Sequence, residues 1–266
     1  MTAFADHERR GDGEPLLLIH GFTATWRVWQ PVLDSLDGFD VLAPTLPGHT
    51  GGPRLDGPVT VEAIADGLEA MLDEVGWSDA HVAGFSLGGW LTLELAKRGR
   101  ARTATPICPA GAPGLHSGAE ARRVERVFRR GRTAARRAGP RIERLARSPR
   151  MRRLMFRDQM VHGERVDPAV AVRMTRDFVA TPIFDALLAD IDRTGGVQDL
   201  GDVTVPVHLV WGTRDRIIPV RHAAWFQEQL PYASLRLIDD AGHVPFWDAP
   251  QAFADEIRRA AKTLVS

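Results

Sequence analysis

The chain has 266 residues, a formal net charge of +0, 44% hydrophobic residues and 26% charged residues. This composition is typical of a globular protein of one or two domains, and the overall charge implies no particular partner. The first fifteen residues carry four acidic side chains and no apolar run, so we expect no secretory signal. The apolar segment 16–19 is far too short to cross a bilayer. The single cysteine, Cys108, excludes an internal disulfide, and a cytoplasmic location is expected.

Short apolar, often β-branched segments alternate along the chain with longer segments of helical periodicity. An antiparallel edge strand is predicted over residues 2–9, before a turn at 10–13. Six further strands are predicted, over residues 16–19, 41–43, 81–83, 105–108, 207–211 and 235–238. Helical patterns are found over residues 59–75, 90–98, 222–230 and 251–264. This alternation predicts an α/β fold with a mostly parallel, twisted sheet flanked by helices.

One long segment interrupts the alternation. From about residue 113 to residue 194 no strand pattern appears, and the sequence is helical and rich in arginine. It lies between the strands that end at Cys108 and begin at Val207, so we expect it to cover the carboxyl ends of the strands, where open α/β sheets bind ligands. The predicted organisation is a core in two parts, 1–112 and 197–266, separated by a helical lid, 113–196.

Residues 84–89 read Gly-Phe-Ser-Leu-Gly-Gly and stand between a predicted strand and a predicted helix. A serine between glycines at such a junction is typical of a nucleophile elbow, in which a tight turn exposes the serine at the start of a helix. Gly84 and Gly88 meet the need for nearly absent side chains around Ser86. The backbone N–H of Leu87 then points toward negative charge that develops beside the serine. Taken alone, the same residues also fit an ordinary Gly-rich turn.

A serine hydroxyl is a weak nucleophile until a base takes its proton, so an active elbow requires a histidine and an acid elsewhere. Asp215 and His243 each come just after a predicted buried strand, in the chain order Ser, Asp, His. A single aspartate in a loop is usually a turn former, and a single histidine is usually structural. The combination of the three positions favours a catalytic triad. His20 follows the first parallel strand, and for it we favour a structural role in which the imidazole bonds to loop backbone.

The chain resembles the α/β-hydrolase superfamily over essentially its full length. The resemblance is carried by His20-Gly21-Phe22, Leu46-Pro47-Gly48-His49, residues 84–89, Gly212-Thr213-Arg214-Asp215 and Gly242-His243. It is similar to the lid-bearing bacterial esterase, haloperoxidase-like, enol-lactonase and C–C hydrolase branches. One departure is Thr45, where relatives often carry an aspartate, usually in a structural role.

The resemblance implies a role for each of the motif residues. Ser86 is then the nucleophile, His243 the general base and Asp215 the acid that orients it, with no cofactor. The backbone N–H groups of Phe22 and Leu87 form the oxyanion hole. Epoxide hydrolases and haloalkane dehalogenases of the superfamily carry an aspartate at the elbow, so the serine argues against both activities. The sequence has no spacing typical of a metal site.

The function expected is therefore that of a serine hydrolase that cleaves a carboxylic ester, thioester or lactone through an acyl-serine. Three alternatives remain: a C–C bond hydrolase, a cofactor-free perhydrolase with the same triad, and a non-catalytic binder of an acidic partner such as an acyl carrier protein. Aromatic residues near the site, Phe85, Phe246 and Trp247, are candidates for the substrate pocket.

The arginines of the lid allow two interpretations. They bind a carboxylate-bearing or carrier-protein-bound substrate, or they form a solvated basic face partly paired with nearby glutamates. A nucleic-acid partner is not expected, because few aromatic residues lie among the arginines.

Overall fold

A computed structural model describes residues 6–113 and 118–263. Seven strands form one sheet in the order β1-β3-β2-β4-β5-β6-β7, in which β1 pairs with β3 antiparallel and all other neighbours are parallel. The strands are β1 (His7–Arg10), β2 (Glu14–Ile19), β3 (Phe39–Pro44), β4 (Ala80–Phe85), β5 (Ala101–Ile107), β6 (His208–Gly212) and β7 (Ser234–Ile238). The α/β fold predicted from the alternation of strands and helices is confirmed.

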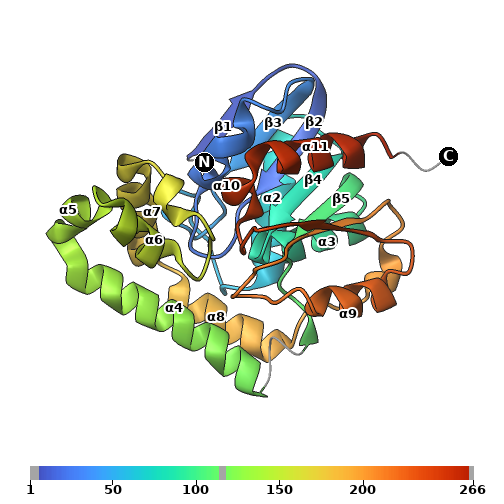
Figure 1. Ribbon diagram of the computed structural model, residues 1–266. Helices are drawn as coiled ribbons and strands as arrows, with labels where there is room; N and C mark the ends of the chain where they lie inside the picture. Colours follow the sequence, from blue (N-terminus) through green and yellow to red (C-terminus); the bar gives the residue numbers. More distant parts are fainter. Residues whose placement is uncertain (1–5, 114–117, 264–266) are drawn as a thin grey trace.

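Helices cover the sheet on both faces. Figure 1 shows α11 in front of the sheet and α3 behind it. The helix α3 packs on β4 and β5 beside α2, while α11 packs on β5 and β7 and contacts α1 and α10. The bounds of the helices around the sheet are η1 (Trp26–Trp29), α1 (Gln30–Leu33), α2 (Val61–Glu74), α3 (Leu87–Lys97), α9 (His222–Gln229), α10 (Pro245–Asp248) and α11 (Pro250–Ala261).

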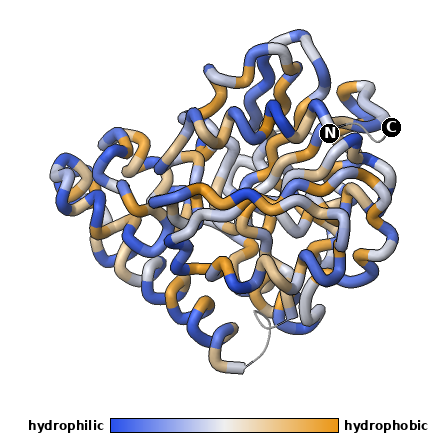
Figure 2. Tube along the Cα trace, turned by 45° about the vertical axis from the view of Figure 1, so that its right-hand side comes forward, coloured by the Kyte–Doolittle hydropathy of each residue, from blue (hydrophilic) through white to orange (hydrophobic). Residues whose placement is uncertain are grey.

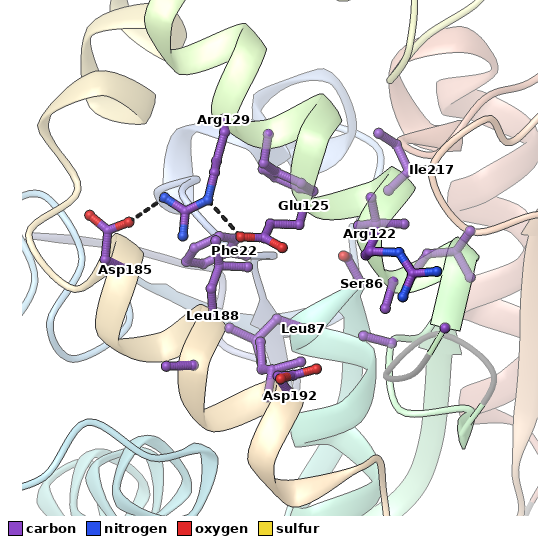
Figure 3. A pocket seen from close by; sticks show the side chains of 18 residues that line it. Phe22, Ser86, Leu87, Arg122, Glu125, Arg129, Asp185, Leu188, Asp192 and Ile217 are labelled. Carbon is purple, nitrogen blue, oxygen red and sulfur yellow. Dashed lines mark hydrogen bonds and ion pairs between the residues drawn. The ribbon is translucent and has the colours of Figure 1, made fainter.

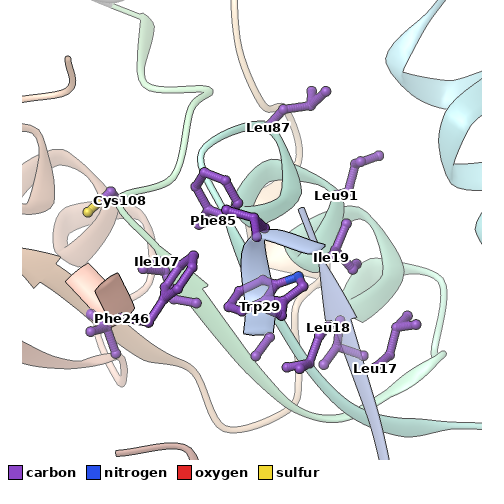
Figure 4. Close-up of a cluster of buried hydrophobic side chains, with 14 of the residues drawn as sticks. Leu17, Leu18, Ile19, Trp29, Phe85, Leu87, Leu91, Ile107, Cys108 and Phe246 are labelled. Atoms are coloured by element: carbon purple, nitrogen blue, oxygen red, sulfur yellow. The ribbon is translucent and has the colours of Figure 1, made fainter. Parts of the chain in front are cut away.

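The core lies around the two central strands. Every residue of β4 is buried, and so are the last four residues of β2, as expected for parallel strands with helices on both faces. Figure 4 shows Phe85 and Phe246 gathered around Trp29, and the rings of Trp29 and Phe246 stack 4.3 Å apart. Burial of each such side chain contributes about 1.5–3 kcal/mol to stability. The site described below is therefore built on the best-packed part of the molecule.

Between β5 and β6 the described chain is helical from Gly118 to Thr194, and we call residues 118–194 the helical insertion. Its elements are α4 (Gly118–Ala138), η3 (Gly139–Arg141), α5 (Ile142–Ala146), α6 (Pro149–Phe156), η4 (Gly163–Arg165), α7 (Pro168–Ala180) and α8 (Phe184–Thr194), and η5 (Leu200–Asp202) follows it. Figure 1 shows α4 along the outside of the molecule, and Figure 2 shows hydrophilic and hydrophobic residues interspersed along this part of the chain. No residue of α4 is buried. The division into two core parts and a lid stays a prediction.

Each predicted strand and helix corresponds to an observed element, but the bounds of most of them differ from those predicted. The strand β5 runs from Ala101 to Ile107, whereas residues 105–108 were predicted. Its first part was missed because Thr103 is polar, although it is buried in the sheet. Part of the predicted edge strand, residues 2–5, lies outside the described residues. The last helix ends at Ala261, before the predicted end at residue 264, which itself lies outside the described residues. In the described ranges, no helix is long and apolar enough to cross a membrane.

Candidate active site

Ser86 occupies a strained turn between β4 and α3. Its backbone adopts φ 58° and ψ −118°, a conformation that non-glycine residues rarely take and that is found at functional sites. The turn is held by hydrogen bonds on both sides: Ser86 N donates to Ile107 O at 2.9 Å, and Ser86 O accepts from Ala110 N at 2.9 Å. Neighbouring backbone therefore fixes the serine at the carboxyl end of the central strand.

The glycines around Ser86 are required by close backbone contacts. A Cβ at position 84 would lie 2.2 Å from Gly88 O, and a Cβ at position 88 would lie 2.2 Å from Ile19 O. A Cβ at position 89 would lie 2.8 Å from Pro109 Cβ. No side chain fits at these distances, which confirms the prediction that the turn needs residues without one.

Asp215 and His243 form a buried hydrogen-bonded pair at the ends of β6 and β7. His243 Nδ1 lies 2.8 Å from Asp215 Oδ2, and the two side chains are 4% and 0% exposed. The other carboxylate oxygen, Oδ1, accepts hydrogen bonds from Ile217 N and Ile218 N, each at 2.8 Å. Because an ionised carboxylate only accepts hydrogen bonds, Nδ1 carries the proton and Nε2 has a free lone pair. The carboxylate thus fixes both the ring orientation and the tautomer.

Nε2 of His243 is buried and has no hydrogen-bond partner within residues 6–113 and 118–263, Ser86 included. The ring of His243 packs edge-on against Phe85, with the centroids 6.2 Å apart, and Phe85 directly precedes Ser86 in the chain. The histidine therefore packs on the residue next to the serine. Catalytic hydrogen bonds in unliganded enzymes are often long and shorten in the substrate complex.

Cys108 lies beside this pair and had no assigned role in the sequence. Its sulfur, a carboxylate oxygen of Asp215 and a ring nitrogen of His243 all lie within 4.8 Å of one another. Burial, the negative charge of Asp215 and a hydrogen bond to it raise the pKa of the Cys108 thiol well above its usual value. The thiol therefore stays protonated beside the hydrogen-bonded pair of Asp215 and His243.

The loop after β2 packs against the serine turn. Gly21 faces the ring of Phe85, and the N–H groups of Phe22 and Leu87 have no acceptor in the described part of the chain. His20 holds this loop: its Nδ1 bonds to Gly21 O at 2.8 Å and its Nε2 accepts from Leu46 N at 2.9 Å. The structural role predicted for His20 is confirmed. Burial and the neighbouring His49 lower the pKa of His20 well below its usual value, so the ring is neutral.

A cavity of about 450 Å³ opens at Ser86 between the carboxyl end of the sheet and the helical insertion. Its apolar walls come from Phe22, Leu87, Ala110, Ala121, Val124, Phe128, Leu188, Ala189, Ile191, Ile217 and Ile218. Five charged residues also line it: Arg122, Glu125, Arg129, Asp185 and Asp192. Figure 3 shows helices α4 and α8 facing Ser86 and Leu87 across this space.

The aromatic residues predicted for the pocket do not line this cavity. Phe85 and Phe246 are buried and pack with Trp29, and Trp247 donates its indole N–H to Val28 O at 2.8 Å. Their places are taken by Phe22 and Phe128, whose rings lie 5.5 Å apart. Sequence reasoning missed the lining residues of α8, because only the packing of α8 against the rest of the molecule brings them to the cavity.

Comparison with known proteins agrees with this geometry. A model described as "Alpha/beta hydrolase family" matches residues 16–256. The chain belongs to this family. As an alpha/beta hydrolase it is a hydrolytic enzyme, and the resemblance recognised in its motifs is confirmed.

Its relatives differ in their named activities. The hydrolase is 33% identical over 197 residues to epoxide hydrolase EphH of Mycobacterium tuberculosis, covering 70% of this chain and 88% of that protein. It is 32% identical over 245 residues to a pimeloyl-[acyl-carrier protein] methyl ester esterase of Aromatoleum aromaticum, covering 89% of this chain and 93% of that protein. A solved esterase from Thermogutta terrifontis shares the fold, with a TM-score of 0.74, 24% identity, and coverage of 96% of this chain and 91% of that one.

Proposed function

We propose that this alpha/beta hydrolase cleaves a carboxylic ester, thioester or lactone through an acyl-serine intermediate. The observation that carries the proposal is the pairing of Asp215 with Nδ1 of His243, which leaves a buried, unpartnered Nε2 beside the serine turn. A lone pair held in this way is suited to take the proton of the Ser86 hydroxyl.

In the proposed reaction, Ser86 Oγ attacks the carbonyl carbon while His243 Nε2 accepts its proton. The bond to the leaving group then breaks, and the imidazolium gives its proton to the departing alkoxide or thiolate. Water, deprotonated by the same imidazole, then attacks the acyl-serine. The bond between the acyl carbon and Ser86 Oγ breaks, the imidazolium returns its proton to Oγ, and the acid is released. Asp215 stabilises the imidazolium that forms in both steps.

The oxyanion of each tetrahedral intermediate needs hydrogen-bond donors that are in place before the reaction. The N–H groups of Phe22 and Leu87 flank the serine turn and have no other acceptor in the described chain, and Leu87 begins helix α3. Donors of this kind contribute roughly 2.7–4 kcal/mol each to transition-state stabilisation. Both residues also line the cavity, so a substrate carbonyl bound there meets them.

The similarity to an epoxide hydrolase does not favour epoxide opening by this chain. If Ser86 opened an epoxide, the product would be an ether, which has no carbonyl for water to attack, and the enzyme would not turn over. An ester of serine has that carbonyl. The residue at position 86 therefore supports acyl transfer.

The test is hydrolysis of p-nitrophenyl esters from acetate to palmitate by the wild-type enzyme, Ser86→Ala and Ser148→Ala. Ser148 is a serine outside the cavity and serves as the matched control. We expect turnover by the wild type and the control, and a loss of about 10⁴-fold or more in Ser86→Ala. Undiminished turnover by Ser86→Ala would exclude the proposed nucleophile.

A further inference from the structure

We propose that Arg122 forms an anion-binding subsite in the cavity, and that the preferred substrates carry a carboxylate in addition to the bond that is cleaved. This inference rests on the proposed function and adds to it the chemical class of the substrate. The inference follows from the ion pairs in the cavity: some of the charged residues are neutralised by neighbouring side chains, whereas Arg122 is not.

Three of the five cavity charges belong to a closed network. Arg129 donates from Nε to Glu125 Oε1 at 2.7 Å and from Nη1 to Asp185 Oδ1 at 2.6 Å. Arg132 approaches the other oxygen of Asp185 at 4.0 Å. Two guanidinium groups and two carboxylates thus balance one another, so Arg129 is not available for a substrate anion.

Arg122 has no such partner. No carboxylate of the described chain lies within 4.0 Å of its guanidinium group, and the sequence of residues 114–117, which precede α4, contains no Asp or Glu. Figure 3 shows Arg122 on the same side of the cavity as Ser86, with Glu125 and Arg129 farther along α4. A free guanidinium beside an apolar cavity is a ready partner for a carboxylate, which it binds through two parallel hydrogen bonds.

Asp192 is the other cavity charge without an ion-pair partner in residues 6–113 and 118–263. Its carboxylate lies on α8, and Figure 3 shows it pointing into the cavity away from Arg129 and Asp185. It repels an anionic group that approaches from α8. The position of a substrate carboxylate is therefore restricted to the Arg122 side, and removal of the Asp192 charge should favour anionic substrates further.

The experiment compares kcat/KM for a neutral ester, p-nitrophenyl butyrate, with that for an anionic ester of similar length, the p-nitrophenyl monoester of glutaric acid. A third substrate, 3-carboxyphenyl butyrate, carries the carboxylate on the leaving group instead. The variants are Arg122→Gln, Arg122→Lys, Asp192→Asn and the control Arg126→Gln. Arg126 lies one helical turn farther along α4 and is exposed like Arg122, but it does not line the cavity.

We expect the wild type to prefer one of the two anionic esters. Arg122 is exposed, so Arg122→Gln should lower the ratio of anionic to neutral kcat/KM by about three- to fivefold, the effect of one ion pair at an exposed side chain. Arg122→Lys should retain part of the preference, Asp192→Asn should raise it, and Arg126→Gln should not change it. The preference should also weaken as NaCl is raised.

Two outcomes separate this inference from the proposed function. Hydrolysis of the neutral ester with an equal effect of Arg122→Gln and Arg126→Gln on the ratio would overturn the subsite and leave the serine hydrolase intact. Absence of hydrolysis with all three esters, together with no labelling of Ser86 by a fluorophosphonate, would overturn both.

Discussion

The carboxyl end of the sheet and the helical insertion both line the cavity, but different forces hold them. At the sheet, Ser86 and Asp215 are fixed by backbone hydrogen bonds and by the packing of fully buried strands. In the insertion, α4 buries no residue completely, and it is held by half-buried apolar side chains such as Phe128 and by arginines on its surface. One of them, Arg123, donates to Arg216 O and Ile217 O, next to Asp215. In the proposed function, the sheet carries the catalytic residues and the insertion selects the substrate.

The largest effect is expected at the sheet end. Asp215→Asn keeps the shape of the side chain but no longer fixes the proton on Nδ1 of His243, and it cannot stabilise the imidazolium. We expect kcat to fall by about 10³–10⁴-fold with little change in KM, as measured with the best p-nitrophenyl ester. Arg123→Gln alters only the attachment of α4. An equal loss of kcat in this variant would contradict the difference drawn here between the sheet and the insertion.

A pair of glycine substitutions tests the difference in packing. Gly88→Ala forces a Cβ to 2.2 Å from Ile19 O, whereas Gly131→Ala in α4 meets its nearest neighbour, Phe178, at an ordinary 3.5 Å. We expect Gly88→Ala to destabilise the protein by about 3 kcal/mol or more. Gly131→Ala should stabilise it by about 0.5–1 kcal/mol through helix propensity. Urea unfolding of both variants gives the change in the free energy of unfolding for each. Similar destabilisation by the two substitutions would contradict the difference in packing between the sheet and α4.

The acid sensitivity of the molecule should also originate near the sheet. Burial lowers the pKa of His49 from 6.5 to about 4, and burial also lowers that of His20. Between about pH 6.5 and pH 4 these histidines are protonated in the unfolded chain but neutral in the folded protein. The free energy of unfolding therefore falls as the pH drops through this range. We expect His49→Gln to reduce the pH dependence of the urea midpoint between pH 7 and pH 5. An unchanged slope would mean that His49 is not buried as a neutral ring.

The same contrast explains what could be predicted from the sequence. The strands were predictable because buried parallel strands are continuous apolar segments, and the elbow because only glycine fits the contacts at positions 84 and 88. The pairing of Asp215 with His243 followed from their order and from their places after strands.

The walls of the cavity were not predictable in this way. Nothing in the local sequence shows that Phe246 turns into the core toward Trp29, or that α8 brings Asp192 to the cavity. Both facts depend on contacts between segments far apart in the chain. The pairing of Glu125 with Arg129 did have a local signal, because residues four apart on a helix are neighbours.

The most direct test of the central claim is to find which residue becomes covalently modified. The enzyme is treated with a fluorophosphonate, digested, and mapped by mass spectrometry, with and without a competing p-nitrophenyl ester. We predict one adduct, on Ser86, which forms more slowly when the ester is present and more slowly in Asp215→Asn. Modification of another residue, or an unmodified Ser86 in an enzyme that still hydrolyses the ester, would contradict the acyl-serine mechanism.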